Sequence, residues 1–360
     1  MAATSYGVNS AEAVKLWSRK LMQEALKETY ASRFMGSTSN DLCQVLDDTT
    51  KSAGDRITNI LRMQLTGQGV SGDGTLEGSE EALTTYTDNL VLDQLRHAVR
   101  SKGKMSEQRI PFTVREEARM GLQDWWADRF DTWFFNQIGG NAGQTDTRYT
   151  GLNTPVAPDS AHRIYVNGHT TEVSITATTS ALFTLGLIDT AVMKARTLTP
   201  IMRPVQTGKG GAKYVMFITP EQHYDLRRNT NTLQWGDINK AAMQGGQISD
   251  NPIFDGSVGM YNGVVLHEAY RLPIIDATGG SKIGRAVLCG AQAAVMAFGR
   301  GQSQNKMDWN EELFDYGNSL GVEAGVIAGL KKTIYNSKDF STITISAAHS
   351  ADSVTNTGRS

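Results

Sequence analysis

Residues 55–100, DRITNILRMQLTGQGVSGDGTLEGSEEALTTYTDNLVLDQLRHAVR, decide the fold of this chain. The stretch is long, polar and rich in turn residues, with five glycines between positions 67 and 78. Glycine and the Ser-Gly and Asp-Gly pairs favour backbone bends with positive φ, while the flanking runs 57–65 and 83–87 are typical of strands. We therefore predict two arms of a long antiparallel excursion. Because such a loop has little core of its own, it is either disordered or completed by contacts outside its own domain.

Composition narrows the function classes. The chain has 360 residues, enough for two connected domains with extensions. Its formal net charge of −2 gives no reason to expect bulk attraction to nucleic acid or to anionic membranes. Cys43 and Cys289 are far apart, which predicts neither a disulfide framework nor a thiolate metal site and favours a reducing compartment. The longest apolar stretch, 286–298, is short and broken by Gly290, so we expect no membrane span.

Residues 10–35 predict an amphipathic helix. Asn9 and Glu12 form a capping-box pattern at its start, and Gly36 stops it. This helix either packs on a neighbouring molecule as an arm or belongs to the core of its own domain. Its apolar stripe comprises Val14, Trp17, Leu21 and Ala25.

Residues 114–138 form the second predicted helix, which follows Pro111 and ends at Gly139 and Gly140. It spans about 35 Å, and its apolar side chains include several Trp and Phe at helical spacing. We therefore expect it to lie across a large apolar surface, such as one face of a sheet. The stripe comprises Ala118, Leu122, Trp125, Trp126, Phe130, Trp133, Phe134 and Ile138.

The second half of the chain predicts an α+β domain with a central sheet. A buried strand at 213–218 leads through Pro220 into a helix from Glu221, with proline at the first helical position. The same order is expected again, with a strand at 286–289 followed by a helix at 291–298. Other expected elements are a helix at 181–197 and strands at 264–268, 320–335 and 340–345.

The sequence predicts no catalytic, cofactor or metal site. Gly208-Lys209 fails as a phosphate loop because Arg203 and Gly210 stand where a Walker A motif needs Gly and Ser or Thr. The acidic segment 73–81 lacks the alternating oxygen ligands of a calcium loop. The six histidines occur singly, with no HExxH spacing, and the chain has no GxSxG elbow. Adjacent glutamate pairs are typical of solvated helix faces rather than of acid/base pairs.

Charge is distributed unevenly around the excursion. Residues 55–90 hold two arginines against six acids, a balance of −4. Residues 94–119 hold seven bases against three acids, a balance of +4. If copies pack side by side, this contrast could steer the loop of one copy onto the base of the next. Ordinary mixed surface charge is the alternative interpretation.

Several segments, in order along nearly the whole chain, carry a family resemblance. They are GDGTLEGSEEALTTYTDNLVLDQLRHAV (72–99), KYVMFITPEQHYDLRRN (213–229), MYNGVVLHEAYRLP (260–273), GRAVLCGAQAAVMAFG (284–299) and DYGNSLGVEAGVIAGLKKTIYNSKDFSTITIS (315–346). Together they resemble the major capsid proteins of tailed bacteriophages, and most of all the family typified by coliphage N-four. The resemblance implies an α+β, HK-ninety-seven-like major capsid fold with an N-terminal arm, an extended β-loop, a peripheral domain with a long spine helix, and an axial domain.

The resemblance also implies a division of the chain. The expected parts are the N-terminal arm at 1–50, the extended loop at 55–100, the peripheral domain at 101–180 with the spine helix at 114–138 and an insertion at 140–180, the axial domain at 181–304, a return to the peripheral domain at 305–345, and a C-terminal tail at 346–360. The residues that we expect at contacts between subunits are Trp17, Leu21, Gln68, Asp73, Glu77, Glu80, Glu81, Arg96 and Arg100.

The implied function is a non-enzymatic shell subunit that self-assembles into hexamers and pentamers around double-stranded DNA. Expected partners are further copies of the chain, a portal protein, a separate scaffolding protein, a decoration protein and, without sequence preference, the packaged DNA. Assembly is expected in the bacterial cytoplasm, with the protein ending in the virion capsid. The alternative is a phage structural protein that binds or hydrolyses polysaccharide, which the Gly- and Thr-rich β segments suggest.

Overall fold

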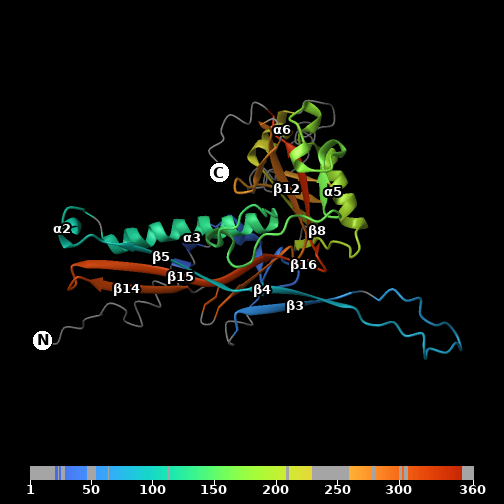
Figure 1. The fold of residues 1–360 in the computed structure, drawn as a ribbon, viewed down its shortest axis with the longest axis horizontal. Coiled ribbons are helices and arrows are strands. Elements are labelled where there is room, and N and C mark those ends of the chain that lie inside the picture. Colours follow the sequence, from blue (N-terminus) through green and yellow to red (C-terminus); the bar gives the residue numbers. More distant parts are fainter. Residues whose placement is uncertain are drawn as a thin grey trace.

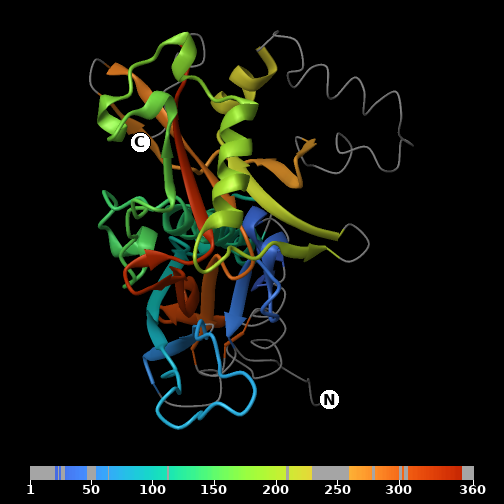
Figure 2. The same cartoon turned by 90° about the vertical axis from the view of Figure 1, so that its right-hand side faces the viewer.

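The computed structural model describes residues 21–22, 24–25, 29–46, 54–63, 65–111, 113–207, 211–228, 259–277, 280–299, 302–303 and 307–350. Figure 1 shows two bodies and one projection. In one body a long helix lies along a sheet, and in the other two shorter helices lie beside a second sheet. A long hairpin extends away from the first body (Figure 1), and Figure 2 views the molecule from the side of its tip.

The first body, which we call the six-stranded body, is organised around the 14-residue strand β15. Its strands follow the order β1-β2-β13-β15-β14, and β5 also pairs with β15. Every pairing of β15 is antiparallel. The strands are β1 (Met35–Gly36), β2 (Cys43–Leu46), β5 (Asp93–Arg100), β13 (Ala294–Phe298), β14 (Asp308–Phe314) and β15 (Ser319–Lys332).

Helix α3 (Val114–Ile138) has the bounds that the sequence predicts and packs on β15. Its apolar stripe is buried except for Trp125, which is half-buried. The Trp125 ring stacks on His97 of β5 at a centroid distance of 4.4 Å, and the Arg129 guanidinium lies 4.8 Å from the same ring. The expectation that this helix lies across an apolar sheet face is confirmed. Each fully buried Phe side chain stabilises the body by about 1.5–3 kcal/mol.

The second body, which we call the eight-stranded body, has the strand order β6-β18-β12-β8-β10-β9, with β11 paired to β12 and β7 to β8. Its helices α5 (Leu185–Thr197) and α6 (Pro220–Arg228) and strands β8 and β10 confirm the elements predicted there. Its strands are β6 (Arg163–Tyr165), β7 (Val205–Thr207), β8 (Gly211–Ile218), β9 (Gly259–Tyr261), β10 (Val264–Glu268), β11 (Ile274–Asp276), β12 (Lys282–Cys289) and β18 (Thr342–Ala348).

The two bodies share a core. One set of buried side chains from the eight-stranded sheet, including Leu288, forms a cluster with buried residues of α5 such as Ile188. Other side chains from the same sheet, such as Phe217, join the cluster that contains Phe134 and Phe135 of α3, with ring centroids 5.9 and 5.4 Å from Phe217. The two bodies therefore cannot separate without exposing aromatic surface. Within the described ranges, no helix has the length and apolarity that a membrane span needs.

The prediction of a helix at 291–298 is wrong. Residues Ala294–Phe298 form strand β13, which pairs with β2 and β15 and is buried at every position. A short apolar run buried on both faces has no periodicity that separates a strand from a helix. The chain turns into β13 at Gln292, whose φ of 58° interrupts any helical path.

The expected domain boundaries also change. Strand β13 belongs to the six-stranded body although it falls inside 181–304. Strand β18, expected with the peripheral part, pairs with β12 over seven residue pairs in the eight-stranded body. Residues 346–350, expected within the C-terminal tail, are held in the fold, because β18 runs to Ala348 and Ser350 N–H donates to Asp225 at 3.0 Å. Residues 351–360 lie outside the described ranges.

Residues 140–180, the expected insertion, contact both bodies. This segment contains the short helix α4 (Thr147–Thr150) and β6, which pairs with β18. Glu172 lies in a 3-10 turn and forms a largely buried ion pair with Arg285 at 2.6 Å. Arg285 also donates to the carbonyls of Gly139 and Gly140 at 2.9 and 2.8 Å, which fixes the end of α3 to the eight-stranded sheet.

The predicted helix at 10–35 does not reach its expected end. Residues Tyr30–Phe34 form a 3-10 helix, and β1 follows directly. Asp131 of α3 holds this turn by accepting bonds from Tyr30 N–H at 3.0 Å and Ala31 N–H at 2.8 Å. The capping box at Asn9 and Glu12 lies outside the described residues.

Candidate functional site

The long hairpin consists of strands β3 (Arg56–Arg62) and β4 (Thr85–Val91), which pair antiparallel along their full length. Met63 N–H donates to Thr84 O at 3.0 Å and continues the ladder. The described tip, residues 65–84, contains no helix or strand. The predicted antiparallel excursion is confirmed, whereas residues 93–100 lie in β5 and belong to the six-stranded sheet.

The tip is braced by Glu81, which bonds back to the opposite side of the loop. Its carboxylate accepts the N–H groups of Thr66 at 2.9 Å and Gly67 at 2.6 Å, together with the Thr66 hydroxyl at 3.2 Å. The Thr66 N–H bond, followed by the Gly67 bond, lowers the pKa of Glu81. Glu80 accepts Gly78 N–H at 2.7 Å. Glu80 and Glu81 therefore stabilise the shape of the tip itself.

The tip exposes apolar as well as charged side chains. Gln68, Asp73 and Glu77 are exposed, as a contact role requires. The exposed apolar side chains of the hairpin were not among the contact residues expected from the sequence, although isolated apolar residues in a polar segment are a signal that could have identified them. Exposed apolar groups gathered on one projection are typical of a surface that another molecule covers. The exposed apolar residues of the hairpin are Ile60, Leu65, Val70, Leu76 and Leu83.

The hairpin root is held to β15 by Asp88. One carboxylate oxygen of Asp88 pairs with the Lys331 ammonium, and the other accepts Ile334 N–H at 3.2 Å. Lys331 Nζ also donates to Asn89 O at 3.0 Å. A Cβ at position 329 would lie 2.4 Å from Val91 O, so Gly329 permits the close approach of β4 to β15.

Asn153 makes a second attachment at the root. Its side-chain amide accepts Val91 N–H at 3.0 Å and donates to Val91 O at 2.7 Å, as a neighbouring strand would. Gln137 near the end of α3 donates to Asn153 O at 2.5 Å. The direction of the hairpin is therefore set by β15, α3 and the segment that joins the two bodies.

The other expected contact residues lie apart from the tip. Arg96 pairs with Glu323 on the same sheet at 3.3 Å, and Arg100 donates to Ser319 at 3.1 Å. Leu21 is fully buried in the core of its own chain, so it leaves the set of proposed contacts with a neighbour. Trp17 lies outside the described residues.

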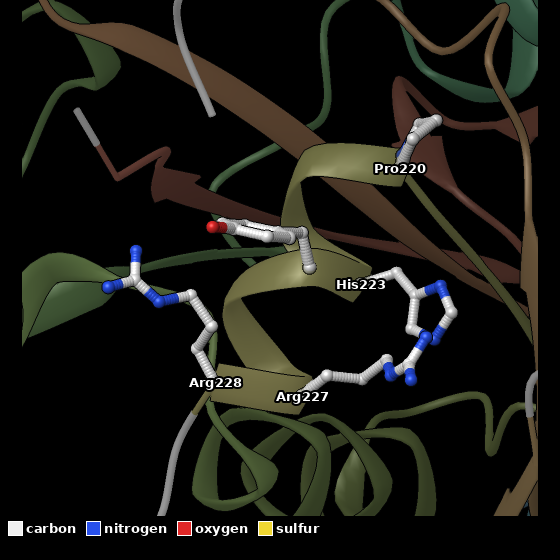
Figure 3. Close-up of a pocket in the computed structure, with 5 residues that line it drawn as sticks. Pro220, His223, Arg227 and Arg228 are labelled. Atoms are coloured by element: carbon white, nitrogen blue, oxygen red, sulfur yellow. The ribbon is translucent and has the colours of Figure 1, made fainter. Parts of the chain in front are cut away.

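Helix α6 borders a surface hollow of about 430 Å³ that is lined by Pro220, His223, Tyr224, Arg227 and Arg228. His223 and Arg227 lie beside each other, and Arg228 points to the opposite side of the helix (Figure 3). His223 Nδ1 lies 2.7 Å from Glu268 Oε2. The lining residues include no serine, cysteine or threonine that could serve as a nucleophile. Within the described ranges, no group of three or more His, Cys, Asp or Glu could hold a metal ion.

Comparison with known proteins agrees with this geometry. Residues 5–351 match the phage capsid protein family. The major capsid protein of Pseudomonas phage KPP25 is 27% identical over 384 alignment positions, which cover 96% of this chain and 97% of that protein. Among solved structures, the capsid of Ralstonia phage GP4 is 31% identical with a TM-score of 0.77, covering 97% of this chain and 95% of that one.

Likeness to a more distant structure is evidence for the fold alone. The capsid of cyanophage Pam1 is 19% identical with a TM-score of 0.72, covering 91% of this chain and 94% of that one. The α+β, HK-ninety-seven-like fold expected from the sequence is thus confirmed. The chain belongs to the phage capsid protein family.

Proposed function

We propose that this chain is the major capsid protein of a tailed phage, and that its copies assemble as hexamers and pentamers into the icosahedral head around double-stranded DNA. The observation that carries the proposal is a likeness to the GP4 capsid that extends over 97% of this chain and 95% of that one. The function is then one of contact area, since many copies together bury far more surface than one pairwise complex. The polysaccharide-binding alternative has no support from the relatives reported above.

In this proposal the six-stranded body is the peripheral domain, with α3 as its spine, and the eight-stranded body is the axial domain. The long hairpin is the extended loop. It contacts a neighbouring subunit through Gln68, Asp73, Glu77 and the exposed apolar side chains of the hairpin. The acidic balance of 55–90 and the basic balance of 94–119, including Arg96 and Arg100, favour a loop laid on the base of the next copy.

The proposed partners beyond further copies are a portal protein, a separate scaffolding protein, a decoration protein and the packaged DNA. The net charge of −2 supports DNA contacts that are weak and independent of sequence. We also propose a non-enzymatic role, assembly in the host cytoplasm and membership of the coliphage N-four group. Membership of that group is supported by the segments quoted for the resemblance, such as 72–99 and 213–229.

The test removes residues 68–78 from the tip. Glu81 binds Gly67, so the two ends of this deletion already lie close together and a short connection can close the loop. We expect folded, soluble subunits that do not close into shells, seen as a normal thermal transition together with empty fields in negative-stain microscopy. Particles of normal size and yield from the deleted chain would refute the role of the tip. Substitution of the exposed Val173, which lies outside the hairpin, by Ser is the matched surface control.

A further inference from the structure

Lys332 and Asp339 form a buried amine and carboxyl pair where the chain passes from the six-stranded to the eight-stranded body. Their side chains are 1% and 3% exposed, and Lys332 Nζ lies 2.7 Å from Asp339 Oδ1. Lys332 Nζ also donates to Val156 O at 3.0 Å. Such isolation from water is unusual for a lysine. The contact also places the Lys332 amine, a potential nucleophile, against the Asp339 carboxyl group, a potential electrophile.

The backbone holds this pair in place. Strands β16 (Ile334–Tyr335) and β17 (Lys338–Asp339) form a two-residue hairpin whose turn, Asn336 and Ser337, has φ values of 49° and 58°. Positive φ at both central residues is typical of a type I′ turn, which fixes the register of the two strands. The hairpin therefore returns Asp339 toward the end of β15, where Lys332 lies.

The bonding of Asp339 is incomplete. Its Oδ1 pairs with Lys332, but its buried Oδ2 has no hydrogen-bond partner among the described residues. The adjacent pair of Lys331 and Asp88 differs, because both carboxylate oxygens of Asp88 are bonded and both side chains are more exposed. A structural ion pair in a protein interior normally satisfies its remaining oxygens, and the 332–339 pair does not.

Burial also favours the uncharged forms of both groups. It is the largest cause that lowers the pKa of Lys332 and the largest that raises the pKa of Asp339. Asp159 lies beside the pair, and its Oδ2 accepts a hydrogen bond from Asp339 N–H at 2.8 Å. The same oxygen lies 2.8 Å from His162 Nδ1. The charge of Arg285 also lowers the pKa of Lys332, and Lys332 in turn acts to lower the pKa of the buried Cys289 thiol.

We propose that Lys332 and Asp339 condense into an intrachain isopeptide bond. The lone pair of the neutral Nζ attacks Cγ of the protonated carboxyl group, the Nζ–Cγ bond forms, and the Cγ–Oδ2 bond breaks. The proton lost from Nζ leaves with the hydroxyl group as one molecule of water, so neither an oxidant nor an activating nucleotide is needed. Asp159 is the carboxylate beside the pair that can carry this proton.

Proximity lowers the barrier to the reaction. Well-oriented intramolecular reactants reach effective concentrations on the order of 10⁵–10⁸ M, so the amine and the carboxyl group react far faster than they would as separate molecules. The bond would close a ring between the end of β15 and β17. It would therefore hold in place the segment by which the chain passes from one body to the other, within each subunit and without linking subunits to one another. The inference does not depend on the proposed capsid function.

The experiment is mass spectrometry of the full-length chain, purified, denatured and digested. We expect peptides joined through Lys332 and Asp339 whose combined mass is lower by one water molecule than the sequence requires. Lys332→Met, which keeps the apolar stem but removes the amine, should restore the full mass. Lys331→Met is the matched control at the adjacent lysine and should retain the deficit.

Two results would overturn the proposal. One is recovery of unmodified peptides containing Lys332 and Asp339 as the dominant wild-type species. The other is a deficit that persists in Lys332→Met, because an aspartyl succinimide also loses water and does not need the lysine. The wild-type measurement is decisive even if the Lys332→Met chain fails to fold.

Discussion

Substitution of Asn153 tests whether the hairpin root is fixed by the bonds that the structure shows. Asn153→Ala removes both hydrogen bonds to Val91, at 3.0 and 2.7 Å, from a side chain that is only 6% exposed. Each such bond contributes about 0.5–1.5 kcal/mol net, so we expect the root to lose about 1–3 kcal/mol of local stability. Global stability should change less, because the hairpin adds little to either core.

The assay is amide hydrogen exchange on the unassembled subunit. A loss of about 1–3 kcal/mol corresponds to exchange that is roughly 5- to 150-fold faster, since about 1.4 kcal/mol is tenfold. The increase should be confined to β4 and the adjoining end of β3, with α3 unchanged. Leu152→Ala alters an exposed neighbour that makes neither bond and serves as the control.

Asn153→Asp refines the result. Its carboxylate can still accept Val91 N–H but cannot donate to Val91 O, so it faces that carbonyl with a negative charge. We expect at least the effect of the alanine variant. Unchanged exchange over β4 in both variants would refute the conclusion that Asn153 orients the hairpin.

Three further predictions concern the core, the junction and the shell. Phe130→Ala in the buried face of α3 should destabilise the subunit by about 3–5 kcal/mol in denaturant unfolding, whereas Asp124→Ala on the exposed face should change little. Burial alone would raise the pKa of Glu172, but the bonds and charge of Arg285 hold it below its ordinary value of 4.5. The ionised Glu172 therefore adds to the free energy of unfolding above that value, and this contribution is lost as the pH falls through the folded-state pKa. A plot of the free energy of unfolding against pH should therefore fall less steeply between about pH 5 and about pH 3 in Glu172→Gln than in the wild type. Finally, residues 52–101 contain no lysine, so we expect boiled particles to release a single band near the 39.2 kDa chain mass, and a ladder resistant to reductant would contradict a shell without covalent links between subunits.

Local patterns account for what the sequence predicted correctly. Helix α3 was predicted to the residue because its 3.6-residue period is long and two glycines end it. The hairpin was predicted because turn residues separate two strand-like runs. In both cases the determining information lies within one contiguous segment.

Long-range pairing accounts for what the sequence missed. Strand β13 carries the same apolar residues as a buried helix, and its partners β2 and β15 are about 250 and 35 residues away in the chain. The assignment of β18 to the eight-stranded sheet depends on its register with β12, which leaves no local mark. The bonds of Asp88 and Asn153 at the hairpin root are equally non-local, and the sequence shows only an ordinary acid and an ordinary amide.

The concentration of buried polar residues near the hairpin root has a geometric reason. From residue 56 to the end of the tip near residue 73, an extended arm reaches at most about 55–60 Å. A tilt of about 10° at the root would therefore move the end of the tip by about 10 Å, more than the width of a side-chain contact. Apolar packing alone tolerates such rotations, because it is not directional. Bonds with fixed donors and acceptors do not. Asp88 of the hairpin bonds Lys331 and Ile334, while Gln137 of the spine helix bonds both Lys332 and Asn153, whose side chain holds Val91. A subunit built in this way holds its hairpin at a defined angle to the six-stranded sheet, which the proposed contact with a neighbouring copy would use.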